Sequence, residues 1–170
     1  MLKIFNDLEP FFNDCYRRIN VREYARIRNI SPPTASTLLE SLKQDGLLNK
    51  EEDRGYNYYF ANKESKIFID LSRNYWYQRF KEIKLTEYFD KELISPLVIL
   101  FGSLSKAEVN ENSDIDIAIF TSSKKELHLE KFEKKLKRKI QIFMFKNENE
   151  VKNKNLLNNL YNGFIVLGNW

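Results

Sequence analysis

The chain of 170 residues contains one cysteine, one histidine and no long apolar run. A single cysteine, Cys15, excludes an internal disulfide and a cysteine-rich zinc site, and we interpret it as a small apolar side chain of the core. The single histidine, His128, has no histidine or cysteine beside it, so a histidine-based metal site is not expected. No segment approaches the roughly 20 apolar residues of a membrane span. No secretory leader pattern is visible either, so we expect a cytoplasmic protein with no membrane partner.

Apolar residues are plentiful, at 42% of the chain against 31% charged residues, and they include 13 Phe and 9 Tyr. These proportions are typical of a soluble globular chain of one or two domains. The formal net charge is +4, but residues 1–62 carry as many acidic as basic side chains. The charge distribution therefore does not indicate a strongly basic DNA-binding domain.

The most informative stretch begins with an apolar strand expected over residues 97–101. At Gly102-Ser103 we expect the chain to turn sharply out of this strand, and a second strand then carries Asp114-Ile115-Asp116. Residues two apart in a strand project on the same face, so the two aspartates should project together while the isoleucines enter the core. Adjacent carboxylates repel each other unless a cation lies between them, and Mg²⁺ bridged to phosphates prefers such oxygen ligands. Gly102 would let a backbone approach a ligand closely, and the N–H groups that follow Ser103 could hold a phosphate.

Gly-Ser followed ten residues later by Asp-x-Asp between apolar residues resembles the DNA polymerase β-like nucleotidyltransferase superfamily. The similarity is greatest to its prokaryotic minimal nucleotidyltransferase branch, through Phe101-Gly102-Ser103 and Ser113-Asp114-Ile115-Asp116. The following loop departs from that branch, because Leu104-Ser105-Lys106-Ala107-Glu108 stands where an Arg-x-Arg-Gly-Glu run is common. The alternative interpretation is an ordinary strand pair with an exposed Asp-x-Asp edge.

The resemblance implies a nucleoside triphosphate, ATP by preference, held at Gly102, Ser103 and Lys106. Asp114 and Asp116 would be catalytic and would hold Mg²⁺, two ions in an active enzyme and one or none in a weakened one. A third catalytic carboxylate is expected from the next strand, residues 139–145, where this chain has Gln141. An amide cannot take a proton from a nucleophile at neutral pH, so the sequence leaves open whether the protein is an enzyme. Glu148, just beyond that strand, is a candidate substitute.

Residues 1–62 predict three helices, over 3–19, 21–28 and 31–45, followed by a two-stranded ribbon of residues 47–50 and 56–60 joined by a turn over 51–55. Asn20 and Ser31 are suited to cap the second and third helices, and Gly46 to end the third. This order resembles the winged helix-turn-helix domain of archaeal and bacterial regulators, whose third helix enters the major groove. The DNA-binding residues that it implies are Arg22, Arg26, Arg28, Pro33, Thr34, Ser36, Thr37, Ser41, Lys43 and Arg54. Protein contact or dimerisation through the same domain is the alternative.

Residues 63–95 predict a helical connector with one long helix over about 64–85. Tyr75-Trp76-Tyr77 places aromatic side chains on several faces of that helix, which favours packing on both domains or a homodimer seam over residues 64–90. Residues 96–170 are then expected to form the nucleotidyltransferase-like domain, with helices over 124–138 and 152–161 and a last strand over 164–167. The predicted fold class is α+β, with a winged helix, a connecting helix and a small mixed sheet.

Two functions are consistent with this organisation. The first is Mg²⁺–NTP binding with transfer of a nucleoside monophosphate to a protein or nucleic-acid hydroxyl, as in antitoxins that modify a partner toxin. The alternative is a weak or inactive enzyme that regulates transcription, using the winged helix for DNA and the other domain for nucleotide sensing or partner binding. A protein-binding scaffold is the third interpretation.

Overall fold

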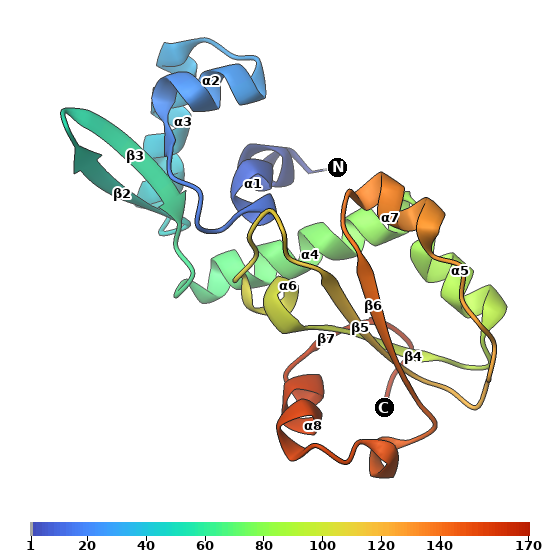
Figure 1. Ribbon diagram of the computed structural model, residues 1–170. Coiled ribbons are helices and arrows are strands. Elements are labelled where there is room, and N and C mark those ends of the chain that lie inside the picture. Colours follow the sequence, from blue (N-terminus) through green and yellow to red (C-terminus); the bar gives the residue numbers. More distant parts are fainter. Residues whose placement is uncertain (1) are drawn as a thin grey trace. The chain divides into compact units, whose positions relative to one another are not determined.

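The computed structural model describes residues 2–170 and contains two groups of elements, each with its own sheet (Figure 1). Contacts divide the chain into a first unit, which runs through Ser72 and includes Ala107–Glu111, and a second unit of Arg73–Lys106 and Asn112–Trp170. The border falls inside one helix, α4 (Lys66–Glu82). The division into segments 1–62, 63–95 and 96–170 stays a prediction.

The first unit has three helices and three strands before α4. They are α1 (Lys3–Asn13), β1 (Ile19–Asn20), α2 (Val21–Arg28), α3 (Pro32–Gln44), β2 (Leu48–Asp53) and β3 (Tyr56–Ala61), with the antiparallel strand order β1-β3-β2. The caps lie where the sequence predicts them, since the Asn20 side chain accepts from the Glu23 N–H and the Ser31 hydroxyl accepts from the Thr34 N–H.

Three local predictions for this unit were wrong. Helix α1 ends at Asn13 instead of residue 19, and Pro10 lies inside it. The strand Ile19–Asn20 was not expected. The turn of the ribbon contains only Arg54 and Gly55, both at positive φ, so β2 continues to Asp53. A two-residue turn of this kind suits the twist of paired strands, which explains why the ribbon is longer than predicted.

The second unit is built around a four-stranded sheet. Its elements are α5 (Leu85–Glu92), β4 (Leu97–Phe101), α6 (Gly102–Lys106), β5 (Ile115–Phe120), α7 (Glu130–Leu136), β6 (Ile140–Phe145), the short 3₁₀ helix η1 (Glu148–Glu150), α8 (Lys154–Tyr161) and β7 (Phe164–Leu167). The strand order is β6-β5-β4-β7, in which β5 and β6 are parallel and the other pairs are antiparallel.

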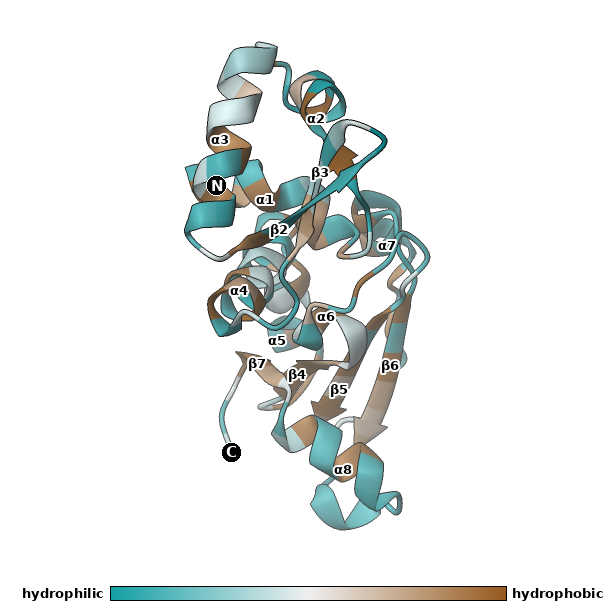
Figure 2. Cartoon of the chain, turned by 90° about the vertical axis from the view of Figure 1, so that its left-hand side faces the viewer, coloured by the Kyte–Doolittle hydropathy of each residue, from teal (hydrophilic) through white to brown (hydrophobic). Residues whose placement is uncertain are grey.

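Helices cover both faces of this sheet, with α8 on one side and α5 and α7 on the other (Figure 1). On the α8 side, Ile99, Phe101, Ala118 and Phe120 pack with Leu160. The alternate residues of β5, the isoleucines at 115, 117 and 119, are fully buried in the opposite direction. The central strands are therefore apolar almost throughout, as Figure 2 shows by colour.

The long helix predicted over about 64–85 is present as α4, and the shorter helix α5 that follows it was not predicted. Helix α4 ends at Glu82, and α5 begins at Leu85 after Lys84, which has a φ of 63°. Tyr75 and Trp76 are each only 1% exposed in the single chain, so they offer no free surface for the predicted homodimer seam. The helix predicted over 124–138 is also shorter, although its apolar residues are buried as expected. Among residues 2–170, no helix has the length and apolar character needed to cross a membrane.

Candidate functional site

Among the glycines of the second unit, Gly102 at the corner between β4 and α6 leaves the least room for a side chain. Phe101, the last residue of β4, pairs with Asp116 of β5, and the chain then turns at Gly102 with a φ of +68°. A Cβ atom at Gly102 would lie 2.2 Å from Oδ2 of Asp116 and 3.1 Å from its Cγ. Only glycine therefore lets the corner pass so close to this carboxylate.

The two aspartates lie together beside the corner. Asp114 directly precedes β5 and Asp116 is its second residue, so both project on one face as predicted. Burial raises the pKa of the Asp116 carboxyl above its ordinary value, and repulsion from Asp114 raises it further. Neither carboxylate forms an ion pair within the described residues. The described part of the site thus places two carboxylates together without an ion pair to either of them.

Gln141 occupies the position where a third carboxylate was expected. In the parallel pairing of β5 with β6, Gln141 lies opposite Asp116. Its Nε2 atom donates a hydrogen bond of 2.7 Å to Oδ2 of Asp114. Glu148 does not substitute for it, because Glu148 lies in η1 beyond the far end of β6 and accepts from the Tyr161 hydroxyl.

Residues 83–163 match the model of the family described as "Polymerase beta, Nucleotidyltransferase". The second unit carries a nucleotidyltransferase-like domain. The match includes the Gly102 corner, both aspartates and Gln141. No curated protein and no solved structure matches the chain.

The nucleotide-binding residues predicted in the nucleotidyltransferase-like domain are only partly brought together. Gly102 and Ser103 are the first two residues of α6, next to Asp116. Lys106 ends the same helix, but its ammonium group donates to Oδ1 of Asn159 on α8 at 3.3 Å. The structure therefore directs Lys106 toward α8, and no contact joins it to the aspartates.

Two arginines that sequence reasoning missed fix the loops of the nucleotidyltransferase-like domain on either side of the site. Arg138 is only 9% exposed, and its Nη1 donates to the Ser113 carbonyl, directly before Asp114, at 2.7 Å. Its guanidinium group also lies 5.5 Å from the ring centre of Trp76. Arg73 donates from Nε to the Ser105 carbonyl in α6 at 2.6 Å. The one available signal was that Arg138 is the single arginine in a lysine-rich segment.

The donor set of the nucleotidyltransferase-like domain fits a hard divalent cation. Two carboxylates and the amide oxygen of Gln141 are all oxygen donors, the type that Mg²⁺ prefers. The two carboxylates repel each other, and Gly102 lets the backbone corner lie directly against the carboxylate of Asp116. Within residues 2–170, no group of three or more His, Cys, Asp or Glu could hold a metal ion, so a complete three-carboxylate site is not present there. The residues fit a cation held by Asp114 and Asp116.

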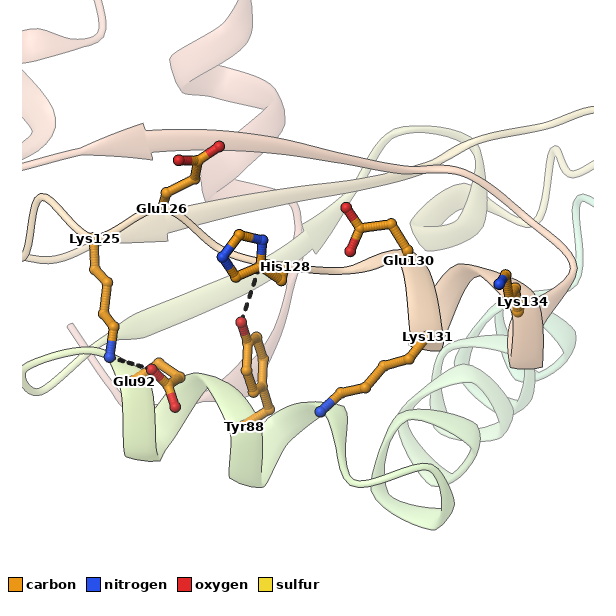
Figure 3. Close-up of a pocket in the computed structure, with 8 residues that line it drawn as sticks. All are labelled: Tyr88, Glu92, Lys125, Glu126, His128, Glu130, Lys131 and Lys134. Carbon is orange, nitrogen blue, oxygen red and sulfur yellow. Dashed lines mark hydrogen bonds and ion pairs between the residues drawn. The ribbon is translucent and has the colours of Figure 1, made fainter.

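A separate cavity of 560 Å³ lies between α5 and α7 (Figure 3). The Lys125 ammonium group pairs with Glu92, and the Tyr88 hydroxyl accepts from the His128 N–H at 2.9 Å. His128 is exposed and lies just before α7, outside any helix. Three lysines and three glutamates line the cavity, so it has no preference for ligands of one charge.

The residues predicted to contact DNA all lie in the first unit. Exposed members are Arg22, Arg26, Pro33, Thr34, Thr37, Ser41, Lys43 and Arg54, while Ser36 is half-buried. Arg28 differs from the prediction, because its Nη2 pairs at 3.2 Å with Asp7, a carboxylate that is only 5% exposed. Arg28 therefore holds the fold together and is not free to meet a phosphate.

The ribbon of the first unit is acidic close to its turn. Glu51, Glu52 and Asp53 are exposed immediately before Arg54, and Arg18 pairs with Glu51 and Asp53. On α3, the Glu40 carboxylate accepts from Lys50 and Tyr59 of the ribbon, which ties the ribbon to that helix. Cations for phosphate contacts are consequently few on this surface.

Proposed function

We propose that the second unit binds a Mg²⁺–NTP complex, ATP by preference, and transfers a nucleoside monophosphate slowly to a hydroxyl of a protein or nucleic-acid partner. The observation that carries this proposal is the Asp116 carboxylate beneath the Gly102 corner, beside a second carboxylate that increases its pKa. Such an arrangement is costly for a protein without a bound cation, and it agrees with the family match over residues 83–163.

Each residue of the site has a distinct part in this reaction. Asp114 and Asp116 hold the cation, which neutralises triphosphate charge when bound. Gly102 allows the backbone to lie against the Asp116 carboxylate, and the N–H groups at the start of α6 would donate to the phosphates. Gln141 orients Asp114 through its hydrogen bond of 2.7 Å. The acceptor oxygen bonds to the α-phosphorus, and pyrophosphate leaves.

Gln141 also sets the rate. The β6 position opposite Asp116 holds Gln141, an amide that cannot take the proton of the acceptor hydroxyl, so that proton passes to water. The loss of a positioned general base commonly costs about 10²–10⁴-fold in rate. A slow transferase suits a regulatory modification, such as that of a partner toxin by its antitoxin, better than it suits metabolic turnover.

The test is incubation of the protein with α-labelled ATP, Mg²⁺ and the separately produced partner. We expect weak labelling of the partner and none with Asp116→Asn. Gln141→Asp should raise the transfer rate by about 10²–10⁴-fold, because it restores a carboxylate beside Asp116. Gln141→Asn is the matched control of the same size without charge. Equal labelling with wild type and Asp116→Asn would refute the proposal, and no rise with Gln141→Asp would refute the role given to Gln141.

A second function is proposed for the first unit, a winged helix-turn-helix that binds DNA and regulates transcription. The capped pair α2 and α3 followed by the β2–β3 ribbon supports it, as do the exposed cations Arg22, Arg26, Lys43 and Arg54. Phosphate contacts release counterions, so binding should weaken steeply with salt, and Arg26→Ala should reduce the salt slope by about 1. Mobility shifts of promoter fragments at about 50 mM salt check this, and no shift of any fragment would contradict it.

A further inference from the structure

A second cavity, of 520 Å³, opens at the end of the sheet opposite the Gly102 corner. It begins at Phe120, four residues after Asp116 on β5, which corresponds to about 13 Å along the strand. The corner and this cavity share none of their residues. Its volume lies within the roughly 300–1,000 Å³ of small-molecule sites.

Hydrogen bonds hold both walls of this cavity in place. On one wall, the Ile94 N–H donates to the Ser123 hydroxyl at 2.8 Å, and the Thr121 hydroxyl donates to the Ile94 carbonyl at 2.9 Å. On the other wall, Asn147 caps η1 by accepting from the Asn149 N–H at 3.0 Å. The cavity is therefore formed before any ligand binds.

One side of the cavity offers an aromatic surface. Trp170 is 51% exposed, and its ring centre lies 5.3 Å from that of Phe120 and 5.5 Å from that of Tyr161. The interplanar angles of 54° and 52° show that neither ring lies parallel to the indole. A planar ligand can therefore stack on Trp170, an interaction worth about 1–3 kcal/mol for a nucleobase.

The polar groups of the cavity suit the edge of a base better than a phosphate. The side-chain amide of Asn149 has no partner within the described residues, and it presents a donor and an acceptor together. Lys146 and Glu148 give the cavity one charge of each sign. Glu148 accepts from the Tyr161 hydroxyl through Oε2 at 2.6 Å, which leaves its other oxygen for an amino group.

We propose that this cavity is a second nucleobase site, which takes adenine or cytosine stacked on Trp170. Asn149 recognises the donor and acceptor edge of the base, and Glu148 accepts from its exocyclic amino group, the group that uracil lacks. A free nucleoside and a base of single-stranded RNA share this chemistry. The site is distinct from the NTP site at the Gly102 corner.

Tryptophan fluorescence tests the proposal directly, because the only other tryptophan, Trp76, is 1% exposed. Titration with adenosine should quench the emission of Trp170 in a saturable way, with uridine at least tenfold weaker. Asn149→Ala, an exposed position that leaves Trp170 intact, should weaken adenosine binding at least tenfold. Trp170→Phe should remove the signal.

A second arm compares adenosine with an adenine hexanucleotide to separate the two sources of the base. Tighter binding of the hexanucleotide assigns the site to single strands, and equal or weaker binding assigns it to free nucleosides. Asp116→Asn separates this site from the NTP site, since it should leave adenosine quenching unchanged. Quenching that is linear in adenosine, unchanged in Asn149→Ala, or lost in Asp116→Asn would overturn the proposal.

Discussion

Replacement of Gly102 by alanine tests the geometry of the Asp116 corner. A non-glycine residue in the left-handed region costs about 1–2 kcal/mol. At Gly102 the new Cβ atom would also lie 2.2 Å from Oδ2 of Asp116, so the carboxylate must rotate away. A displaced side chain adds about 0.5–1.5 kcal/mol. We expect Gly102→Ala to lower the free energy of unfolding by about 1.5–3.5 kcal/mol and to move the proposed cation ligand out of position.

Gly46→Ala is the matched control. Gly46 has a φ of +72°, close to the +68° of Gly102, but a Cβ atom there would have no neighbour within 4 Å. Gly46→Ala should therefore lower the free energy of unfolding by only the backbone cost of about 1–2 kcal/mol. Mn²⁺–ATP affinity, measured by electron paramagnetic resonance, should fall at least tenfold in Gly102→Ala and stay unchanged in Gly46→Ala.

A double-mutant cycle isolates the clash with the carboxylate. In an Asp116→Ala background, Gly102→Ala should cost about 0.5–1.5 kcal/mol less than in the wild type, because the displaced atoms are gone. Urea unfolding of the four proteins measures this coupling. Wild-type Mn²⁺–ATP affinity in Gly102→Ala, or additive unfolding energies in the cycle, would refute the reasoning.

Two further predictions concern the same unit. In metal-free buffer, Asp116→Asn should be more stable than the wild type at pH 7. The pKa of Asp116 is raised above its ordinary value of 3.8 by folding, so the wild type loses stability as the pH rises from 3.8 through the folded-state pKa. Below pH 3.8 the carboxyl is protonated in both states, and the difference between the two proteins should disappear. Urea titrations at pH 7 and pH 3 would show this. Arg138→Met removes the donor to the Ser113 carbonyl and the cation beside Trp76, and should lower the free energy of unfolding by about 1.5–3 kcal/mol. A shift of Trp76 emission in Arg138→Met, smaller in Arg138→Lys, checks the second contact.

Features with a local cause were predicted well from the sequence. Asn20 and Ser31 cap their helices because a cap depends on residues within one turn. The strands β4 and β5 were predicted correctly, because an apolar run and aspartates alternating with isoleucines are patterns typical of strands. Gln141 lies beside Asp116 because strand order and parallel register follow from the connection through α7.

The features that failed depend on contacts distant in sequence. Helix α5 was not predicted, because no side chain at Lys84 caps its start and marks it in the sequence. Glu148 was considered near the aspartates, but six residues of β6 carry it to the other end of the sheet. Arg28 looked free until Asp7, 21 positions away, proved to be its partner.

The segment Ala107–Glu111 belongs to the first unit although both of its flanks belong to the second. It includes Val109, which is fully buried and whose carbonyl accepts from the Cys15 N–H at 2.7 Å. The chain thus passes between the two units three times, and the segment Ala107–Glu111 separates the glycine corner from the aspartates in the sequence. No single proteolytic cut can release either unit intact. A shortened chain that starts at Arg73 would expose the apolar side chain of Val109 to water and leave its carbonyl without the Cys15 donor. The proposed roles of the two units are therefore better separated by point substitutions than by truncation.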